Sequence, residues 1–179
     1  MRTFIAVEVP ESVRKSIHDF ITIEAKSELP IKWVAFDNLH ITLKFLGEID
    51  EKKKADIVPA IEDVCRKQGR FRVRLGGLGC FPAPRNPRIL WVGVEDGDTV
   101  FCHIAAELEK ELREFGFEEE KRFHSHLTIG RVKKPCRVDS ILEKDINTDA
   151  FEVSSITLFE STLRLEGPIY DALDRFTLV

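Results

Sequence analysis

The sequence lacks the cysteine spacing of a disulfide-bonded or zinc-binding protein. Its four cysteines are scattered with no CxxC or similar pair, at Cys65, Cys80, Cys102 and Cys136. No apolar run approaches the roughly 20 residues of a membrane helix, and the opening MRTFIAVEVP has no apolar core of a signal peptide. We therefore expect a cytoplasmic protein with no membrane-bound part, whose thiols are buried and reduced.

The sequence also lacks an excess of positive charge. Its 27 Lys and Arg residues are outnumbered by 31 Asp and Glu residues, which gives a net charge of −4. A protein that wraps long nucleic acids around a broad basic face needs the opposite balance. One or two local cations still suffice to hold a single phosphate. Any nucleic-acid partner is therefore expected to be a chain end or a small fragment.

Low-complexity segments and Gly- and Ser-rich linkers are absent too, so we expect one compact domain over residues 1–179. Hydrophobic periodicity predicts strands at 2–9, 31–34, 39–45, 71–78, 89–94, 124–132, 151–165 and 170–178, and helices at 11–24, 52–66, 98–115 and 138–144. A loop with three prolines, 81–87, is expected between two of the strands, and Gly116 is expected to end the third helix. Because strands and helices alternate only in part, the order favours an α+β fold with mixed or antiparallel sheets.

One short pattern, His-x-Thr-x with apolar residues at both x positions, occurs twice. The copies begin at His40, in HITLKFLG, and at His126, in HLTIGR, and both fall on predicted strands. Residues i and i+2 of a strand lie on the same face, so each histidine is expected beside its threonine, Thr42 or Thr128. Two such strands, related by a pseudo-twofold axis, would place two imidazoles and two hydroxyls around one cleft.

This group of side chains suits the cleavage of a phosphodiester. The reaction needs a base to deprotonate the nucleophile and an acid to protonate the leaving oxygen. Histidine can take either role near neutral pH, and threonine hydroxyls can donate hydrogen bonds to the nonbridging phosphate oxygens. The chemistry requires neither a metal ion nor a cofactor.

The paired motifs resemble those of the two-histidine phosphoesterase superfamily, and within it the RNA 2′,3′-cyclic phosphodiesterases, also called 2′-5′ RNA ligase-like proteins. The resemblance extends to the opening RTFIAVEVP, the pair GLGCFP and RILWVGV, and the ending STLRLEGPIYDALDRFTL. It implies a bilobal α+β fold with two pseudo-twofold-related sheets, outer helices and a central cleft. It also implies hydrolysis of RNA 2′,3′-cyclic phosphates to 2′-phosphomonoesters, with 2′-5′ joining of RNA ends as a side activity in reverse.

The same resemblance implies a role for each motif residue. His40 would be the proton donor and His126 the proton acceptor, while Thr42 and Thr128 would bind the phosphate. The substrates would be RNA 3′ ends or small cyclic-phosphate nucleotides, and a monomer is the simplest expectation.

Strand alternation predicts the face of the strand on which each neighbouring residue lies. Lys44 is predicted on the His40 face, where it could bind a phosphate, and Phe45 on the core face, where it could not stack on a base. Arg131 is predicted to point away from His126 unless Gly130 kinks the strand, although the family resemblance makes it a candidate substrate contact. His124 is expected to be an exposed residue at the end of a strand.

Three other functions remain open from the sequence. A metal enzyme could use His40, His124 and His126 as ligands, although the repeated threonines would then have no purpose. A non-catalytic protein that binds RNA ends is a second possibility. A phosphodiesterase acting on 2′-5′ oligoadenylate or another cyclic nucleotide is a third, because the motifs cannot separate substrates that share one chemistry.

Overall fold

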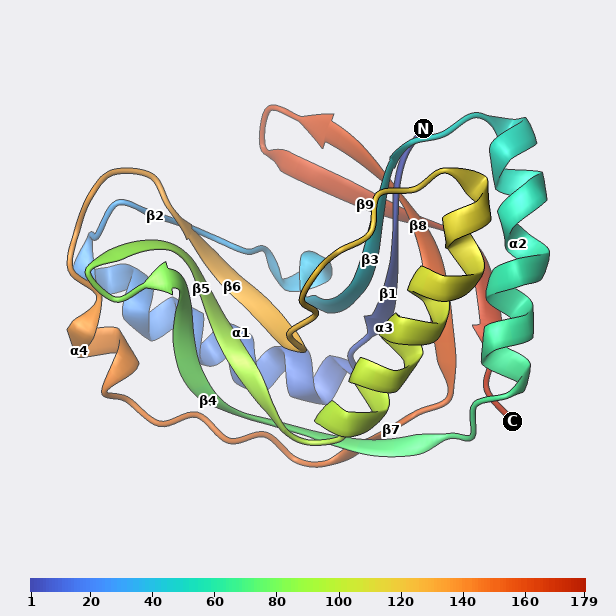
Figure 1. The fold of residues 1–179 in the computed structure, drawn as a ribbon. Helices are drawn as coiled ribbons and strands as arrows, with labels where there is room; N and C mark the ends of the chain where they lie inside the picture. Colours follow the sequence, from blue (N-terminus) through green and yellow to red (C-terminus); the bar gives the residue numbers. More distant parts are fainter.

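The computed structural model describes residues 1–179, which form one curved arrangement of antiparallel strands with helices on its outer side (Figure 1). In chain order the elements are β1 (Arg2–Glu8), α1 (Glu11–Glu24), β2 (Ile31–Trp33), β3 (His40–Glu48), α2 (Glu51–Arg66), β4 (Phe71–Ala83), β5 (Asn86–Asp96), α3 (Asp98–Leu112), β6 (His126–Val132), α4 (Asp139–Leu142), β7 (Phe151–Val153), β8 (Ser155–Arg164) and β9 (Gly167–Thr177). Short 3-10 turns lie at Ala25–Ser27, Phe36–Asn38 and Arg113–Phe115. The expected α+β class is confirmed.

The strand predicted over 124–132 begins only at His126, and the helix predicted over 138–144 is limited to Asp139–Leu142. Two other predicted elements differ by more than their ends. The strand predicted over 151–165 is divided at Ser154, so that β7 pairs with β4 while β8 pairs with β1. The proline-rich loop is shorter than expected, because β4 and β5 extend through it and pair as far as Ala83 and Asn86. Each change follows from tertiary pairing, which a single stretch of sequence does not reveal.

The strand order is symmetric about the two strands that carry the repeated motif. It runs β7-β4-β5-β6-β3-β1-β8-β9, with β2 paired to β6. The first lobe contains β1, β3, β8 and β9, and the second contains β2, β4, β5, β6 and β7. In each lobe the motif strand pairs with the strand that precedes a long helix, β1 before α1 and β5 before α3.

A single residue pair joins the motif strands of the two lobes, Ile41 of β3 with Leu127 of β6. These are the residues between the histidine and the threonine of each motif, and both side chains are fully buried. Since both turn into the core, the flanking motif residues of the two strands share the opposite face. We call this surface, which carries His40, Thr42, His126 and Thr128, the motif face.

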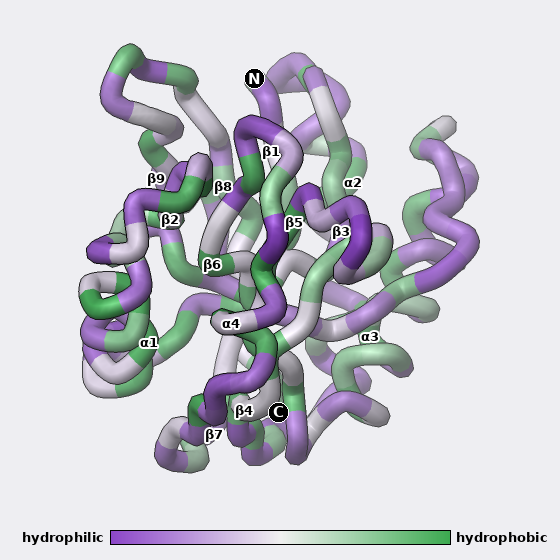
Figure 2. Tube along the Cα trace, turned by 90° about the vertical axis from the view of Figure 1, so that its left-hand side faces the viewer, coloured by the Kyte–Doolittle hydropathy of each residue, from purple (hydrophilic) through white to green (hydrophobic).

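The helices are amphipathic and cover the side of the strands away from the motif face. Helix α1 buries Val13, Ile17 and Ile21, one per turn, and Figure 2 shows hydrophobic and hydrophilic positions alternating along it. Helices α2 and α3 pack against each other and against the first lobe, whereas α4 packs against β4 of the second (Figure 1). Gly116, at φ 82°, ends the 3-10 turn after α3 as expected.

One continuous core of 34 buried residues runs through both lobes. A separate group of Phe4, Ala6 and Phe159 is buried on the motif face of the first lobe. All four cysteines are free thiols, but the expectation that they are buried holds for Cys65 alone. None of the helices has both the length and the hydrophobicity required to cross a lipid bilayer.

The buried junction between the lobes leads to a prediction about the stability of the protein. Leu127→Ala is expected to lower the free energy of unfolding by about 2–5 kcal/mol, because it leaves a cavity where the motif strands meet. Urea denaturation followed by circular dichroism measures the change. Ile23→Ala, at a position that is 61% exposed on α1, is the matched control and should change little. A cost below about 1 kcal/mol for Leu127→Ala would show that the junction repacks freely.

Candidate active site on the motif face

Both motif histidines are held by the same backbone contact. The Nδ1 atom of His40 lies 2.6 Å from the carbonyl oxygen of Asn38, and the Nδ1 atom of His126 lies 2.6 Å from the carbonyl oxygen of His124. A carbonyl oxygen can only accept, so each Nδ1 carries a hydrogen. In the neutral rings Nε2 therefore carries the basic lone pair, able to accept a proton or, once protonated, to donate it.

Burial favours the neutral form of both rings. Desolvation is the main cause that lowers the pKa of His40 to about 4, and nearby positive charge at Arg131 and His126 adds to it, against the opposing effect of the Asn38 hydrogen bond. Desolvation also lowers the pKa of His126, with His124 and Arg131 contributing. These charge effects place Arg131 and both histidines in one electrostatic group.

The threonines occupy the positions that strand geometry predicts. The Thr42 hydroxyl lies 2.8 Å from Nε2 of His40, where it donates to the neutral ring. Thr128 is half-buried at the equivalent place on β6, two residues after His126. Continuing the antiparallel register outward from Ile41 and Leu127 sets Thr42 across from His126 and Thr128 across from His40.

Each motif strand has a β-bulge directly after its threonine. On β3 the pairing with β1 passes from Thr42 to Lys44 while β1 advances one residue, so Leu43 is extra. On β6 the pairing with β5 passes from Thr128 to Gly130, so Ile129 is extra. A bulge reverses the alternation of the residues that follow it. The second residue after each threonine therefore turns toward the core and the third turns toward the motif face.

The bulge on β3 contradicts the predictions for Lys44 and Phe45. Lys44 is 1% exposed on the core side, where its ammonium lies 2.6 Å from Glu109 of α3 and 3.0 Å from the carbonyl oxygen of Glu118. It cannot reach a phosphate on the motif face. Phe45, predicted to face the core, is 62% exposed, and its ring centroid lies 6.1 Å from that of Phe4.

The bulge on β6 has the opposite consequence for Arg131. Simple alternation points this side chain away from His126, whereas the bulge at Ile129 turns the exposed Arg131 toward the motif face. Its positive charge lowers the pKa of His40 and also affects Tyr170. Gly130 turns inward, where a Cβ atom would approach Ile31 of β2 to 2.8 Å, so only glycine fits there.

Aromatic side chains form the walls around both histidines. The ring centroid of His40 lies 5.0 Å from that of Phe4 and 5.2 Å from that of Tyr170. The His126 centroid lies 5.2 Å from Phe81 and 6.3 Å from Trp91. These apolar neighbours exclude water, which accounts for the desolvation of the rings.

Sequence reasoning did not identify what Tyr170 and His124 contribute to the site. Tyr170 carries no motif and lies on the last strand, so only its tertiary placement reveals it. The ring of His124 is exposed, as predicted, and lies 4.9 Å from Trp91 between centroids. Its contribution to the site is its backbone carbonyl, a group that every residue has and no sequence pattern can single out.

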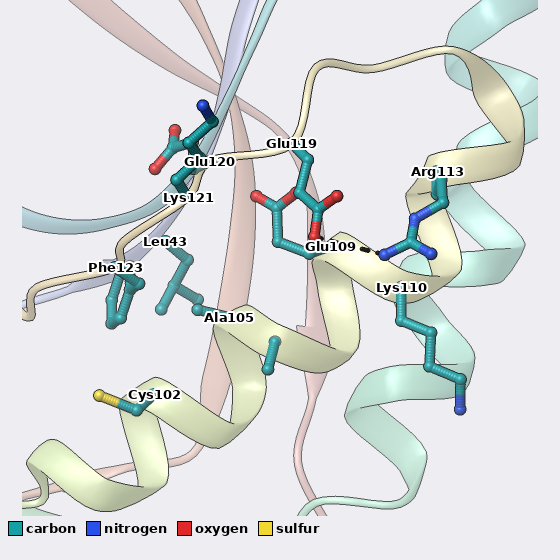
Figure 3. A pocket seen from close by; sticks show the side chains of 11 residues that line it. Leu43, Cys102, Ala105, Glu109, Lys110, Arg113, Glu119, Glu120, Lys121 and Phe123 are labelled. Carbon is teal, nitrogen blue, oxygen red and sulfur yellow. Dashed lines mark hydrogen bonds and ion pairs between the residues drawn. The ribbon is translucent and has the colours of Figure 1, made fainter.

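Two cavities lie near these strands, and only one of them contains a motif histidine. A cavity of about 190 Å³ adjoins His40, and Glu8, Arg175 and Tyr170 are among the residues that line it. The larger cavity, of about 250 Å³, lies behind β3 between α3 and the segment 119–123 (Figure 3). It is lined by Leu43, Cys102 and Phe123 among others, and because Leu43 is buried on the core side it does not open on the motif face.

No group of three or more His, Cys, Asp or Glu side chains is arranged to hold a metal ion. The metal-enzyme alternative required His40, His124 and His126 to converge as ligands.

Two half-buried histidines and two threonines on facing motif strands of an antiparallel α+β fold define a two-histidine phosphoesterase. The sequence profile of the LigT-like phosphoesterases matches residues 7–91 and 98–170, and the chain belongs to this family.

Several relatives match over almost the whole chain. The RNA 2′,3′-cyclic phosphodiesterase of Thermotoga maritima is 39% identical, over 97% of this chain and 93% of its own length. That of Methanothermobacter thermautotrophicus is 33% identical over 99% of both chains. Among solved structures, TT0787 of Thermus thermophilus superposes with a TM-score of 0.86 at 31% identity, over 99% of this chain and 98% of its own. Escherichia coli LigT complexed with 3′-AMP gives 0.82 at 26% identity, over 99% and 97%.

The lowered pKa of His40 predicts how the imidazole titrates. In the folded protein the pKa of His40, about 4, lies below the ordinary pKa of 6.5. Between these two pH values the unfolded chain binds a proton that the folded protein does not. The free energy of unfolding is therefore about 3 kcal/mol higher above pH 6.5, and this difference is lost as the pH falls from 6.5 toward 4. An NMR titration of the ring protons, assigned with His40→Asn, should give a midpoint near 4, and added inorganic phosphate should raise it. A midpoint near 6.5 without phosphate would contradict the effect of burial.

Proposed function

We propose that this chain hydrolyses RNA 2′,3′-cyclic phosphate ends to 2′-phosphomonoesters, with His40 as the proton donor and His126 as the proton acceptor. One observation carries the proposal. Each histidine has its Nδ1–H tied to a backbone carbonyl, so two Nε2 atoms are available on one face beside two threonine hydroxyls. A single phosphate held between these atoms meets an acid on one side and a base on the other.

The steps balance without a further reactant. Nε2 of His126 removes a proton from a water molecule as the water oxygen attacks phosphorus. The bond from phosphorus to the 3′ oxygen breaks, and Nε2–H of His40 delivers a proton to that oxygen. The 2′ ester bond remains, which gives the 2′-phosphomonoester. Thr42 and Thr128 donate hydrogen bonds to the nonbridging oxygens, and the charge of Arg131 stabilises the negative charge that develops on them.

The low pKa of His40 in the free protein is compatible with a donor role. Desolvation lowers this pKa most, and the positive charges of Arg131 and His126 lower it further. A phosphodiester bound between the rings brings a negative charge that offsets those charges and favours the protonated imidazole. Substrate binding therefore supplies the proton donor in the state that the reaction needs.

The relatives support the choice of substrate. Proteins that carry the name RNA 2′,3′-cyclic phosphodiesterase align with nearly the whole chain at 33% and 39% identity, and E. coli LigT was crystallised with 3′-AMP. All four motif residues come from one chain, so a monomer suffices for this chemistry. The substrates are RNA 3′ ends or small cyclic nucleotides of the cytoplasm, and 2′-5′ joining is the same displacement with the 5′-hydroxyl of a second RNA end in place of water.

Loss of either histidine should abolish most of the activity. In excess EDTA, adenosine 2′,3′-cyclic phosphate is expected to give the 2′-phosphate, and His40→Ala and His126→Ala should each lower kcat by about 10²–10⁴-fold. Chromatography that resolves 2′-AMP from 3′-AMP measures both rate and product. His103→Ala, which removes an exposed histidine of α3, should keep full activity. Near wild-type turnover in either motif variant, or a 3′-phosphate product, would refute the assignment.

A substrate with sulfur at the 3′ bridging position should separate the two roles. A thiolate leaves without protonation, so the loss of a proton donor matters less than the loss of a base. His40→Ala should recover most of its activity on this substrate, whereas His126→Ala should not. Single-turnover rates of both variants on the oxygen and sulfur substrates test the difference. Recovery in His126→Ala instead would mean that the donor and acceptor are exchanged.

A further inference from the structure

Phe45 is the one aromatic residue among the large hydrophobic side chains that the structure leaves exposed. Single exposed apolar residues are common in proteins, so exposure alone gives Phe45 no role. Its placement is what distinguishes it. The bulge at Leu43 turns it onto the motif face, three residues beyond Thr42, and removes it from the core that alternation assigns to it.

Phe45 belongs to a row of aromatic residues that starts beside the proposed catalytic site. It pairs in register with Phe4 of β1, which pairs in turn with Phe159 of β8. Phe4 and Phe159 are buried, and Phe4 also contacts the His40 ring at 5.0 Å between centroids. Phe45 is thus the solvent-facing end of an aromatic row that begins at the proposed proton donor.

The direction of the proposed reaction fixes where the nucleoside lies. The leaving 3′ oxygen must face His40, and the attacking water must face His126 on the opposite side of phosphorus. The ribose carries the leaving oxygen, so the ribose and its base lie over the first lobe. Water approaches from the second lobe, beside Phe81 and Trp91.

Phe45 is the most exposed aromatic side chain of the first lobe. Tyr170 is half-buried, and its ring lies nearly perpendicular to those of Phe4 and His40, with interplanar angles of 74° and 87°. Phe4 and Phe159 are covered. Among aromatic rings, Phe45 packs only against Phe4, in a tilted contact at 6.1 Å, and the side chain is 62% exposed.

From this geometry we propose that Phe45 is the platform on which the base of the terminal nucleotide stacks, and so a substrate-binding residue. The inference rests on the proposed function. Stacking accepts any base because every base has an aromatic face, so Phe45 would provide affinity for nucleosides without selecting among them. The equivalent position on β6 is Arg131, on the lobe where no base is expected.

A pair of substrates with and without a base tests the proposal. The first is adenosine 2′,3′-cyclic phosphate, and the second is 1,4-anhydroribitol 2,3-cyclic phosphate, which has the same sugar and phosphate without the base. Phe45→Ala should lower kcat/KM about 5- to 100-fold on the adenosine substrate, mainly by raising KM. It should leave kcat/KM on the base-free substrate unchanged. Phe45→Trp should retain the preference for the nucleoside.

Matched variants separate stacking from a purely structural role of the side chain. Phe45→Leu keeps the apolar bulk but loses the aromatic face, and should resemble Phe45→Ala. Ile23→Ala removes a side chain of similar exposure, 61%, from α1 and should change neither substrate. Equal losses on both substrates in Phe45→Ala would indicate a role in folding or in the catalytic geometry and would overturn the proposal, as would no loss on either.

Binding measurements keep this result distinct from failure of the proposed function. Titration calorimetry with 2′-AMP and with the base-free anhydroribitol phosphate requires no turnover. If Phe45→Ala weakens binding of 2′-AMP alone, Phe45 is a stacking platform whether or not the cyclic phosphate is hydrolysed. If it weakens binding of both ligands equally, or of neither, the platform is excluded even where hydrolysis proceeds.

Discussion

The pairing of Ile41 with Leu127 is the interaction on which the site depends. It is the only residue pair that joins β3 to β6, and it fixes the register of the two motifs relative to each other. A shift of one residue on either strand would turn a histidine and its threonine into the core. Both partners are fully buried, so the hydrophobic core that joins the lobes also sets the relative position of the proposed catalytic groups.

The sequence reveals this arrangement as far as strand alternation holds. The repeat at His40 and His126 predicted two strands, one shared face and the neighbouring threonines, because those features depend only on a period of two. Beyond the threonines the prediction failed for Lys44, because the bulge at Leu43 arises from pairing with β1. The exact strand register is a tertiary property, and no residue near Leu43 marks the bulge on β3. On β6 the glycine at Gly130 suggests a kink, but it does not by itself fix the direction of Arg131.

Lys44 was expected to bind the phosphate, but it supports the site from the core side of β3 instead. Its buried ammonium binds Glu109 of α3 and the carbonyl oxygen of Glu118. Glu118 belongs to the segment that leads from α3 to His124, whose carbonyl oxygen in turn holds the His126 ring. A buried ammonium without its partners is costly, so these contacts tie both α3 and the segment that contains Glu118 to β3. The first motif strand thereby helps to position the histidine of the second.

The backbone of the site is nearly twofold symmetric, whereas the reaction is not. Both strands present a histidine, a threonine, a bulge and then an exposed residue at the same spacing, and both rings use the same contact to a carbonyl. A symmetric pair of imidazoles cannot by itself decide which one protonates the leaving oxygen. The difference must come from the residues that break the symmetry, and the clearest is the position after each bulge. Phe45 gives the first lobe an exposed apolar surface, while Arg131 gives the second a positive charge. If a base stacks on Phe45 as proposed, the substrate enters in one orientation, and the proposed roles of the two histidines follow from it.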